Sequence, residues 1–88
     1  MDREKTLKRL QFRSWHRGTR EADAIIGGFF DKYGATWTDE EIIWFENLLE
    51  HDDVDVMAWA IGTQPIPDQL QGPQMECMKQ LDFVDPYK

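Results

Sequence analysis

The 88 residues of this chain suffice for one small domain, and 17 acidic against 10 basic residues give a formal net charge of -7. A domain of this size buries about 60% of the surface that its unfolded chain exposes, enough for one modest core. The single cysteine excludes an intramolecular disulfide and a cysteine-rich zinc site. No apolar run reaches the ~18 residues of a membrane span, and the negative charge disfavours nucleic acid as the main partner.

The charge is distributed unevenly along the chain. Residues 1–20 contain seven Lys or Arg and two Asp or Glu, a net of +5, whereas residues 21–88 contain three and fifteen, a net of -12. The sign changes at residues 17–23, where a glycine interrupts one helical pattern and a new helix begins. We therefore place the candidate functional site at this break.

The first predicted helix covers residues 3–15, where apolar residues recur every three to four positions and Lys or Arg fill the other side. The second covers residues 19–33. Its Gly27 and Gly28 each cost about 1 kcal/mol relative to alanine, which indicates the close approach of a neighbouring helix. Gly34 stands where a C-terminal cap belongs.

The third helix has the clearest start signal in the chain. Thr38 and Glu41 have the spacing of a capping box, and Trp37 before them can act as a hydrophobic staple. Its apolar face carries Phe45 and two leucines. A short fourth helix, residues 54–61, follows a pair of aspartates.

A glycine ends the fourth helix, and residues 63–72 then contain two prolines and a second glycine. This composition predicts a rigid surface connection rather than an element. A last helix is expected over roughly residues 73–82, with Cys77, Met78 and Leu81 directed inward. The chain as a whole therefore predicts an all-α fold, a single five-helix bundle over residues 1–88 with loose termini at residues 1–4 and 84–88.

Catalytic and metal-binding arrangements are poorly supported. His16 and His51 are the only histidines, and neither has a Cys, a Ser or a second His at ligand or triad spacing. The acidic run at residues 50–53 is interpreted as a solvated helix cap rather than a cation site, because consecutive residues at a helix end splay apart. Cys77 is interpreted as core rather than as a nucleophile. We predict no catalytic residue, no metal and no enzymatic activity.

Three of the four tryptophans fall at helix-compatible packing positions. Trp15 instead lies among basic residues at the end of the first helix, which indicates partial burial or a protein contact. Stacking on single-stranded nucleic acid is the alternative interpretation of such a cluster.

Arg17, Gly18 and Glu21 have the pattern R-G-x-x-E. In a purely structural interpretation Gly18 is a tolerable N-cap and Glu21 reaches back to its N–H. In a functional interpretation a glycine at an exposed helix start lets another backbone come close, and the neighbouring arginine offers a bidentate donor to a partner. The residues by themselves leave both interpretations open.

The wider pattern resembles a known family. Arg-Gly-Thr-Arg-Glu-Ala-Asp at residues 17–23, the helix end at 29–33, Phe-Glu-Asn-Leu-Leu-Glu at 45–50 and Asp-Asp-Val-Asp at 52–55 before Trp59 stand in the family's order. Together they resemble the small succinate dehydrogenase assembly factors that promote flavinylation, the SdhE-like RGxxE proteins. The similarity covers roughly residues 5–85, although the Gly-Pro region before the last helix is less typical.

The resemblance implies a five-helix bundle without catalytic activity. Such factors bind the flavoprotein subunit of succinate dehydrogenase, and in some bacteria that of fumarate reductase, and promote covalent attachment of FAD to a histidine of that subunit. FAD then belongs to the partner, and no cofactor is held stably by this chain. We expect a monomer in the bacterial cytoplasm, or in the mitochondrial matrix of a eukaryote, with no nucleic acid or membrane partner. The expected partner-binding residues are Arg17, Gly18, Glu21, Arg13, His16, Asp52 and Asp53.

Two other function classes fit the same residues. One is a generic acidic helical interaction or regulatory module, antitoxin-like or inhibitor-like, with a basic N-terminal contact patch. The other is a nucleic-acid binder that uses residues 3–20, and an enzyme with its own turnover ranks last.

Overall fold

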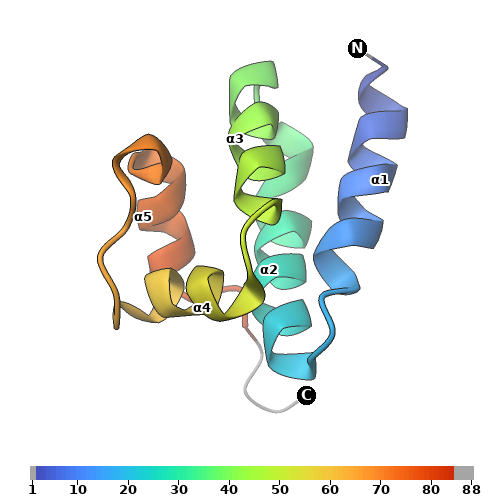
Figure 1. Ribbon diagram of the computed structural model, residues 1–88. Helices are drawn as coiled ribbons and strands as arrows, with labels where there is room; N and C mark the ends of the chain where they lie inside the picture. Colours follow the sequence, from blue (N-terminus) through green and yellow to red (C-terminus); the bar gives the residue numbers. More distant parts are fainter. Residues whose placement is uncertain (1, 85–88) are drawn as a thin grey trace.

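The computed structural model describes residues 2–84, and within them every regular element is helical (Figure 1). The elements in chain order are α1 (Arg3–Trp15), α2 (Arg20–Tyr33), the 3-10 turn η1 (Gly34–Thr36), α3 (Asp39–Leu49), α4 (Asp53–Ile61), the 3-10 turn η2 (Asp68–Leu70) and α5 (Pro73–Lys79). The predicted all-α fold with five α-helices is confirmed. No helix within residues 2–84 is both long and apolar enough to cross a bilayer.

Helices α1, α2 and α3 lie side by side, with α2 running opposite to the other two, while α4 crosses at their lower end and α5 packs beyond α3 (Figure 1). The core is aromatic at its centre, where Phe29 of α2 is fully buried. Its ring lies 5.4–6.2 Å, centroid to centroid, from those of Tyr33, Trp37, Trp44, Phe45 and Phe83. Side chains from α2, α3 and the C-terminal segment thus share one cluster.

The predicted helix ends of the central region are confirmed. Thr38 Oγ1 accepts from the Glu41 N–H and the Glu41 carboxylate accepts from the Thr38 N–H, so the capping box is complete. Gly62 ends α4 in the left-handed conformation, at φ 96°. Gly34 follows α2 in a right-handed conformation instead. A Cβ there would lie 2.8 Å from the Phe30 ring, so the glycine makes room for an aromatic side chain.

The connection between α4 and α5 differs from the prediction. It contains η2, whose Leu70 is 1% exposed and belongs to the core. The Leu70 carbonyl accepts the indole N–H of Trp44 at 3.0 Å. Two prolines and a glycine did mark a break in helix periodicity, but they did not reveal that one leucine between them closes the core.

The last helix is shorter than predicted and presents a different face. It ends at Lys79, and its inward residues are Met75 and Met78. Cys77 is exposed, so its assignment to the core was wrong. One position along an α-helix is a rotation of about 100°, which carries Cys77 off the face that Met78 buries. Leu81 lies beyond the helix, partly buried, at φ 54°.

The two mid-helix glycines of α2 were predicted to admit a neighbouring helix, which holds for Gly27, whereas Gly28 faces the non-helical segment after α5. A Cβ at Gly27 would overlap the indole ring of Trp15, which projects from α1. A Cβ at Gly28 would lie 3.1 Å from the carbonyl oxygen of Phe83, so the C-terminal segment is the second neighbour. The Trp15 indole N–H then donates to Asp31 at 3.1 Å. Trp15 is therefore a packing residue that remains 37% exposed.

The segment after α5 is attached to α2 by polar contacts. The Tyr33 hydroxyl lies 3.1 Å from both carboxylate oxygens of Asp82, and Lys32 Nζ lies 3.1 Å from one of them. Phe83 and Val84 pack against the core as partly buried residues. The remainder of the predicted loose tail, residues 85–88, lies outside the described residues.

A double-mutant cycle tests the pairing of Trp15 with Gly27. Gly27→Ala should destabilise the protein by about 1–3 kcal/mol through overpacking. In a Trp15→Ala background the same change should stabilise it by about 1 kcal/mol, because alanine is the better helix former. Urea unfolding measures both effects, and equal destabilisation in the two backgrounds would contradict the contact.

The Asp82 contacts predict a dependence of stability on pH. The hydrogen bond from Lys32 lowers the pKa of the Asp82 carboxyl below its ordinary value of 3.8. A depressed folded-state pKa contributes stability above the unfolded-state value, and that stability is lost as the pH falls through the folded-state pKa. The hydrogen bond with Asp82 likewise raises the pKa of Lys32 above 10.5, so its contribution is lost as the pH rises past that value.

The urea concentration at the midpoint of unfolding is measured as a function of pH between about pH 2 and pH 7. Asp82→Asn should flatten the acid limb of this curve, whereas Asp68→Asn, at an exposed position of η2, should leave it unchanged. An acid limb of equal slope in both variants would assign the dependence to other carboxylates.

Candidate partner-docking site

The arginines of the N-terminal segment face acidic residues of α3 and of the start of α4. Because α1 and α3 run in the same direction, the pairs advance together along both helices (Figure 1). The shortest N–O distances are 2.7–3.3 Å, in the pairs Arg3–Asp39, Arg9–Glu46, Arg13–Glu50 and Arg17–Asp53. Much of the positive charge in residues 1–20 is thus opposed by carboxylates of the same molecule. The predicted basic contact patch is correspondingly reduced.

The last pair differs from the other three in its burial. The Arg17 and Asp53 side chains are 13% and 23% exposed, whereas each of the other three pairs has one side chain more than half exposed. Exposed ion pairs contribute about 0–1 kcal/mol, while a hydrogen bond to a charged and less solvated group contributes about 1.5–3 kcal/mol. The Arg17–Asp53 contact therefore dominates this row of charges.

Arg17 connects the motif loop (residues 16–19, between α1 and α2) to the junction of α3 and α4. Its Nε donates to Asp53 Oδ1 at 2.7 Å, and its Nη2 donates to the carbonyl oxygens of Leu49 and His51 at 3.1 and 3.2 Å. The Arg17 backbone N–H donates to Asp23 Oδ1 at 2.7 Å. The loop is held by its side chain on one side and by its backbone on the other.

Gly18 is exposed and adopts φ 112°, a conformation that side chains rarely tolerate. A Cβ there would meet no atom within 4 Å. The N-cap of α2 is Thr19, whose hydroxyl accepts from the Ala22 N–H at 3.1 Å. The interpretation of Gly18 as N-cap with Glu21 reaching back was therefore wrong by one position.

Glu21 consequently falls in the first turn of α2 without a capping role. It is exposed, and within residues 2–84 its carboxylate has no hydrogen-bond or ion-pair partner. A carboxylate at a helix N-terminus is favoured by the helix dipole. Glu21 thus stands out toward solvent, two residues beyond Thr19.

The other predicted site residues surround the motif loop unevenly. His16 is exposed and stacks on Phe12, with ring centroids 3.9 Å apart. Arg13 is paired with Glu50. Asp52 is the N-cap of α4 but makes no side-chain capping bond, and it is exposed. Among residues 2–84 no three His, Cys, Asp or Glu side chains converge as metal ligands would.

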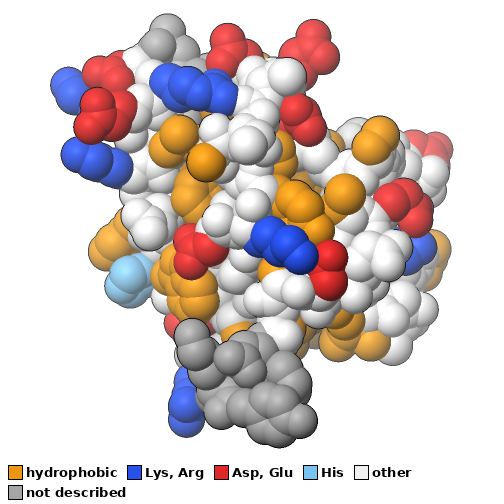
Figure 2. Space-filling model, turned by 180° about the vertical axis from the view of Figure 1, so that it is seen from behind, with side chains coloured by type: hydrophobic (Ala, Val, Ile, Leu, Met, Phe, Trp, Pro, Cys, Tyr) orange, Lys and Arg blue, Asp and Glu red, His pale blue; other side chains and the backbone are white. Residues whose placement is uncertain are grey.

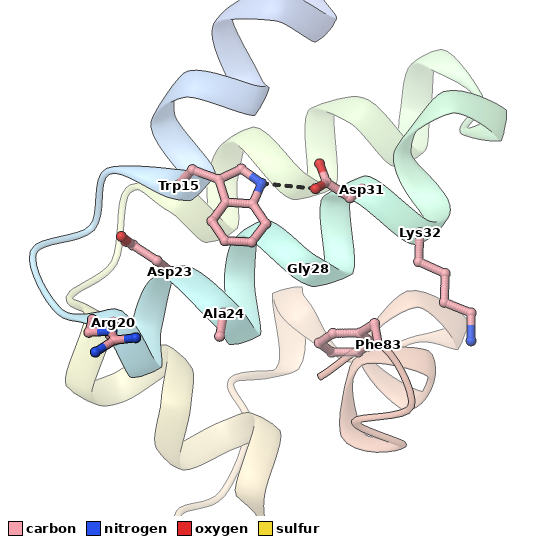
Figure 3. A pocket seen from close by; sticks show the side chains of 8 residues that line it. All are labelled: Trp15, Arg20, Asp23, Ala24, Gly28, Asp31, Lys32 and Phe83. Atoms are coloured by element: carbon pink, nitrogen blue, oxygen red, sulfur yellow. Dashed lines mark hydrogen bonds between the residues drawn. The ribbon is translucent and has the colours of Figure 1, made fainter. Parts of the chain in front are cut away.

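A groove runs along α2. It lies on the face shown in Figure 2, where apolar side chains gather among charged ones. This α2 groove has a volume of about 610 Å³. Figure 3 shows the indole of Trp15 above α2, the ring of Phe83 on its other side, and Ala24 and Gly28 between them. Its charged lining residues are Arg20, Asp23, Asp31 and Lys32.

Sequence reasoning located the motif loop and included Asp53 among the site residues, but it missed Asp23, which also holds the loop. Asp23 had no recognised role, although it lies six residues beyond Arg17 and binds its N–H. Phe83 likewise had no predicted role, although it lines the α2 groove. The signal for the groove was the glycine pair of α2, because two adjacent positions without side chains mark where other chain segments come close.

This chain is similar to known proteins over most of its length. Residues 8–82 match the family described as "Flavinator of succinate dehydrogenase". The FAD assembly factor SdhE of Acetobacter pasteurianus is 41% identical over 71 residues, which cover 81% of this chain and 65% of that protein.

Mitochondrial proteins are similar over the same region. The protein named succinate dehydrogenase assembly factor 2, mitochondrial, is 32% identical in Drosophila grimshawi, over 83% of this chain and 51% of the relative. Its namesake in Saccharomyces cerevisiae is 33% identical over 89% of this chain and 49% of the relative. The chain thus spans from about half to about two thirds of the length of these relatives. Since the family match covers most of the chain, the protein belongs to the family of succinate dehydrogenase flavinators.

Proposed function

We propose that this protein is an assembly factor that binds the flavoprotein subunit of succinate dehydrogenase and promotes covalent attachment of FAD to it. Family membership supports the assignment. The observation that supports a particular site is the motif loop, which is exposed at Gly18 and held in place by hydrogen bonds of Arg17. The proposed docking site comprises Arg17, Gly18 and Glu21 with the bordering residues Arg13, His16, Asp52 and Asp53, and within it Gly18 and Glu21 supply the contact.

The geometry suits docking rather than chemistry. Gly18 leaves a stretch of backbone that a partner's main chain can approach without meeting a side chain. The exposed Glu21 carboxylate, one turn further along, supplies a charge for a donor on that partner. Because the loop is already fixed by Asp23 and Asp53, little conformational entropy is lost when it docks.

The function follows from preferential binding. A factor that binds one conformation of the flavoprotein more tightly than others raises the population of that conformation. If FAD and its target histidine lie in reacting geometry there, the bond forms faster through positioning alone. The accepting histidine then belongs to the partner, and His16 and His51 need no nucleophilic role.

The proposed partner class extends to the flavoprotein subunit of fumarate reductase, which the resemblance described above implies as a second partner in some bacteria. We propose that the factor acts as a monomer, in the compartment that holds the flavoprotein precursor. That compartment is the cytoplasm of a bacterium or the matrix of a mitochondrion.

The reaction itself provides the test. Purified apo-flavoprotein is incubated with FAD, with and without this protein, and covalent flavin is followed by the fluorescence of the denatured subunit in a gel. Covalent flavin should appear several-fold faster with the factor. Equal rates in both reactions would overturn the proposed function.

FAD should not bind tightly to the factor alone. Two of the four charged residues that line the α2 groove are carboxylates, which oppose a diphosphate. Titration of FAD into the purified protein should leave flavin fluorescence unquenched at low-micromolar concentration, and quenching in that range would contradict the prediction.

Substitution of Gly18 separates docking from backbone strain. Gly18→Ala should cost about 1–2 kcal/mol of stability, since alanine is strained at positive φ, and should also weaken binding of the flavoprotein. Gly62→Ala is the matched control, because Gly62 has φ 96° and no atom within 4 Å of an added Cβ. It should lose similar stability in urea unfolding yet bind normally. Equal binding by the two variants would remove Gly18 from the docking surface.

A further inference from the structure

The hydrogen bonds of Arg17 leave it poorly suited to contact a partner. Recognition of a carboxylate by arginine uses two adjacent N–H groups as a planar fork. In this structure Nε and Nη2 form that edge of the guanidinium, and both donate within the chain, to Asp53 and to the carbonyl oxygens of Leu49 and His51. Only Nη1 has no partner within residues 2–84. The bidentate donor predicted from the sequence is therefore already used.

The acceptors are the end of one helix and the start of the next. Leu49 is the last residue of α3, His51 lies in the connection, and Asp53 is the first residue of α4. Carbonyl groups at a helix C-terminus have no intrahelical partner, and a cation there also interacts favourably with the helix dipole. Arg17 thus satisfies the end of α3 and is fixed by Asp53, whose carboxylate accepts from it at 2.7 Å.

Fixing Arg17 also fixes its neighbour in the chain. Gly18 follows directly and adopts φ 112°, one of several conformations open to glycine. Without an anchor on the preceding residue, the motif loop would sample these alternatives. The Asp23 bond to the Arg17 N–H holds the backbone from the α2 side, and Asp53 holds the side chain from the α4 side.

We infer that Asp53 is a positioning residue for the docking site: it does not touch the partner, but through Arg17 it holds the motif loop in the conformation that binds. The inference rests on the proposed function in one respect, the identity of the partner. It assigns Asp53 and Arg17 an indirect role, while Gly18 and Glu21 make the contact.

The test compares Asp53→Asn with Asp55→Asn. Asp55 also lies in the first turn of α4, and within residues 2–84 its carboxylate has no hydrogen-bond or ion-pair partner, so its variant controls for charge removed at the same helix start. Three quantities are measured: amide hydrogen exchange of residues 16–20 in the isolated protein, and the rates of association with and dissociation from the purified apo-flavoprotein subunit. Urea unfolding of each variant at the assay temperature establishes that all are folded there.

Asp53→Asn should accelerate exchange in residues 16–20 and slow association about tenfold, because only the fraction of molecules with an ordered loop is competent to bind. Dissociation of the formed complex should remain near the wild-type rate. Glu21→Gln should show the opposite pattern, with unchanged exchange and faster dissociation. Asp55→Asn should change none of these quantities.

Arg17→Lys provides a second variant if Asp53→Asn does not fold. Lysine keeps the positive charge but lacks the planar set of donors, so it should also raise loop exchange and slow association. Once either change is present, adding the other should cause little further loss. Additive losses, or faster dissociation of Asp53→Asn with unchanged loop exchange, would make Asp53 a contact residue and overturn the inference.

The two levels of the proposal fail in different ways. If the wild-type protein does not bind the flavoprotein, the proposed function fails. The exchange measurement still tests whether Asp53 holds the motif loop in place. If the wild-type protein binds and Glu21→Gln weakens binding, but Asp53→Asn leaves exchange and association unchanged, only the positioning role is overturned.

Discussion

The pair of Arg17 and Asp53 joins the motif loop, which follows α1, to the junction of α3 and α4. The more exposed pairs along α1 and α3 align the two helices but contribute little free energy, because water screens them. The Arg17 guanidinium is mostly shielded and also satisfies two carbonyl groups. Removing it would leave those groups and a carboxylate without their partners, which costs more than an exposed pair contributes.

Glycine serves two different purposes in this fold. Gly27 and Gly28 lie inside a helix and lower its intrinsic stability, but they let Trp15 and Phe83 pack where side chains would collide. Gly18 has open space around it and is instead selected by its backbone conformation. The two glycines of α2 are therefore structural, while the exposed one leaves its surroundings accessible to another molecule.

The arrangement of charge in the fold differs from what its distribution along the chain suggests. A segment with a net charge of +5 precedes one of -12, which suggests a basic surface on an acidic protein. In the fold the two are laid against each other, so that arginine and carboxylate groups meet between helices. Opposite charge separated in sequence served here to dock one helix on another. In the proposed docking site, a short edge of backbone at Gly18 and the outward carboxylate of Glu21 are left for a partner.

The sequence by itself determined the helical class, the capping box of α3, the end of α4 at Gly62 and the place of the motif, because all of these depend on local spacing and on residue conformational preferences. Only the tertiary structure decided that Leu70 enters the core, that Cys77 faces outward, and that Asp23 and Asp53 hold Arg17. These outcomes depend on which helix faces meet and on partners up to 36 residues away. Local periodicity carries no information about such pairings. Many acidic residues could pair with each arginine in principle, and the packing of α1 against α3 determines which one does.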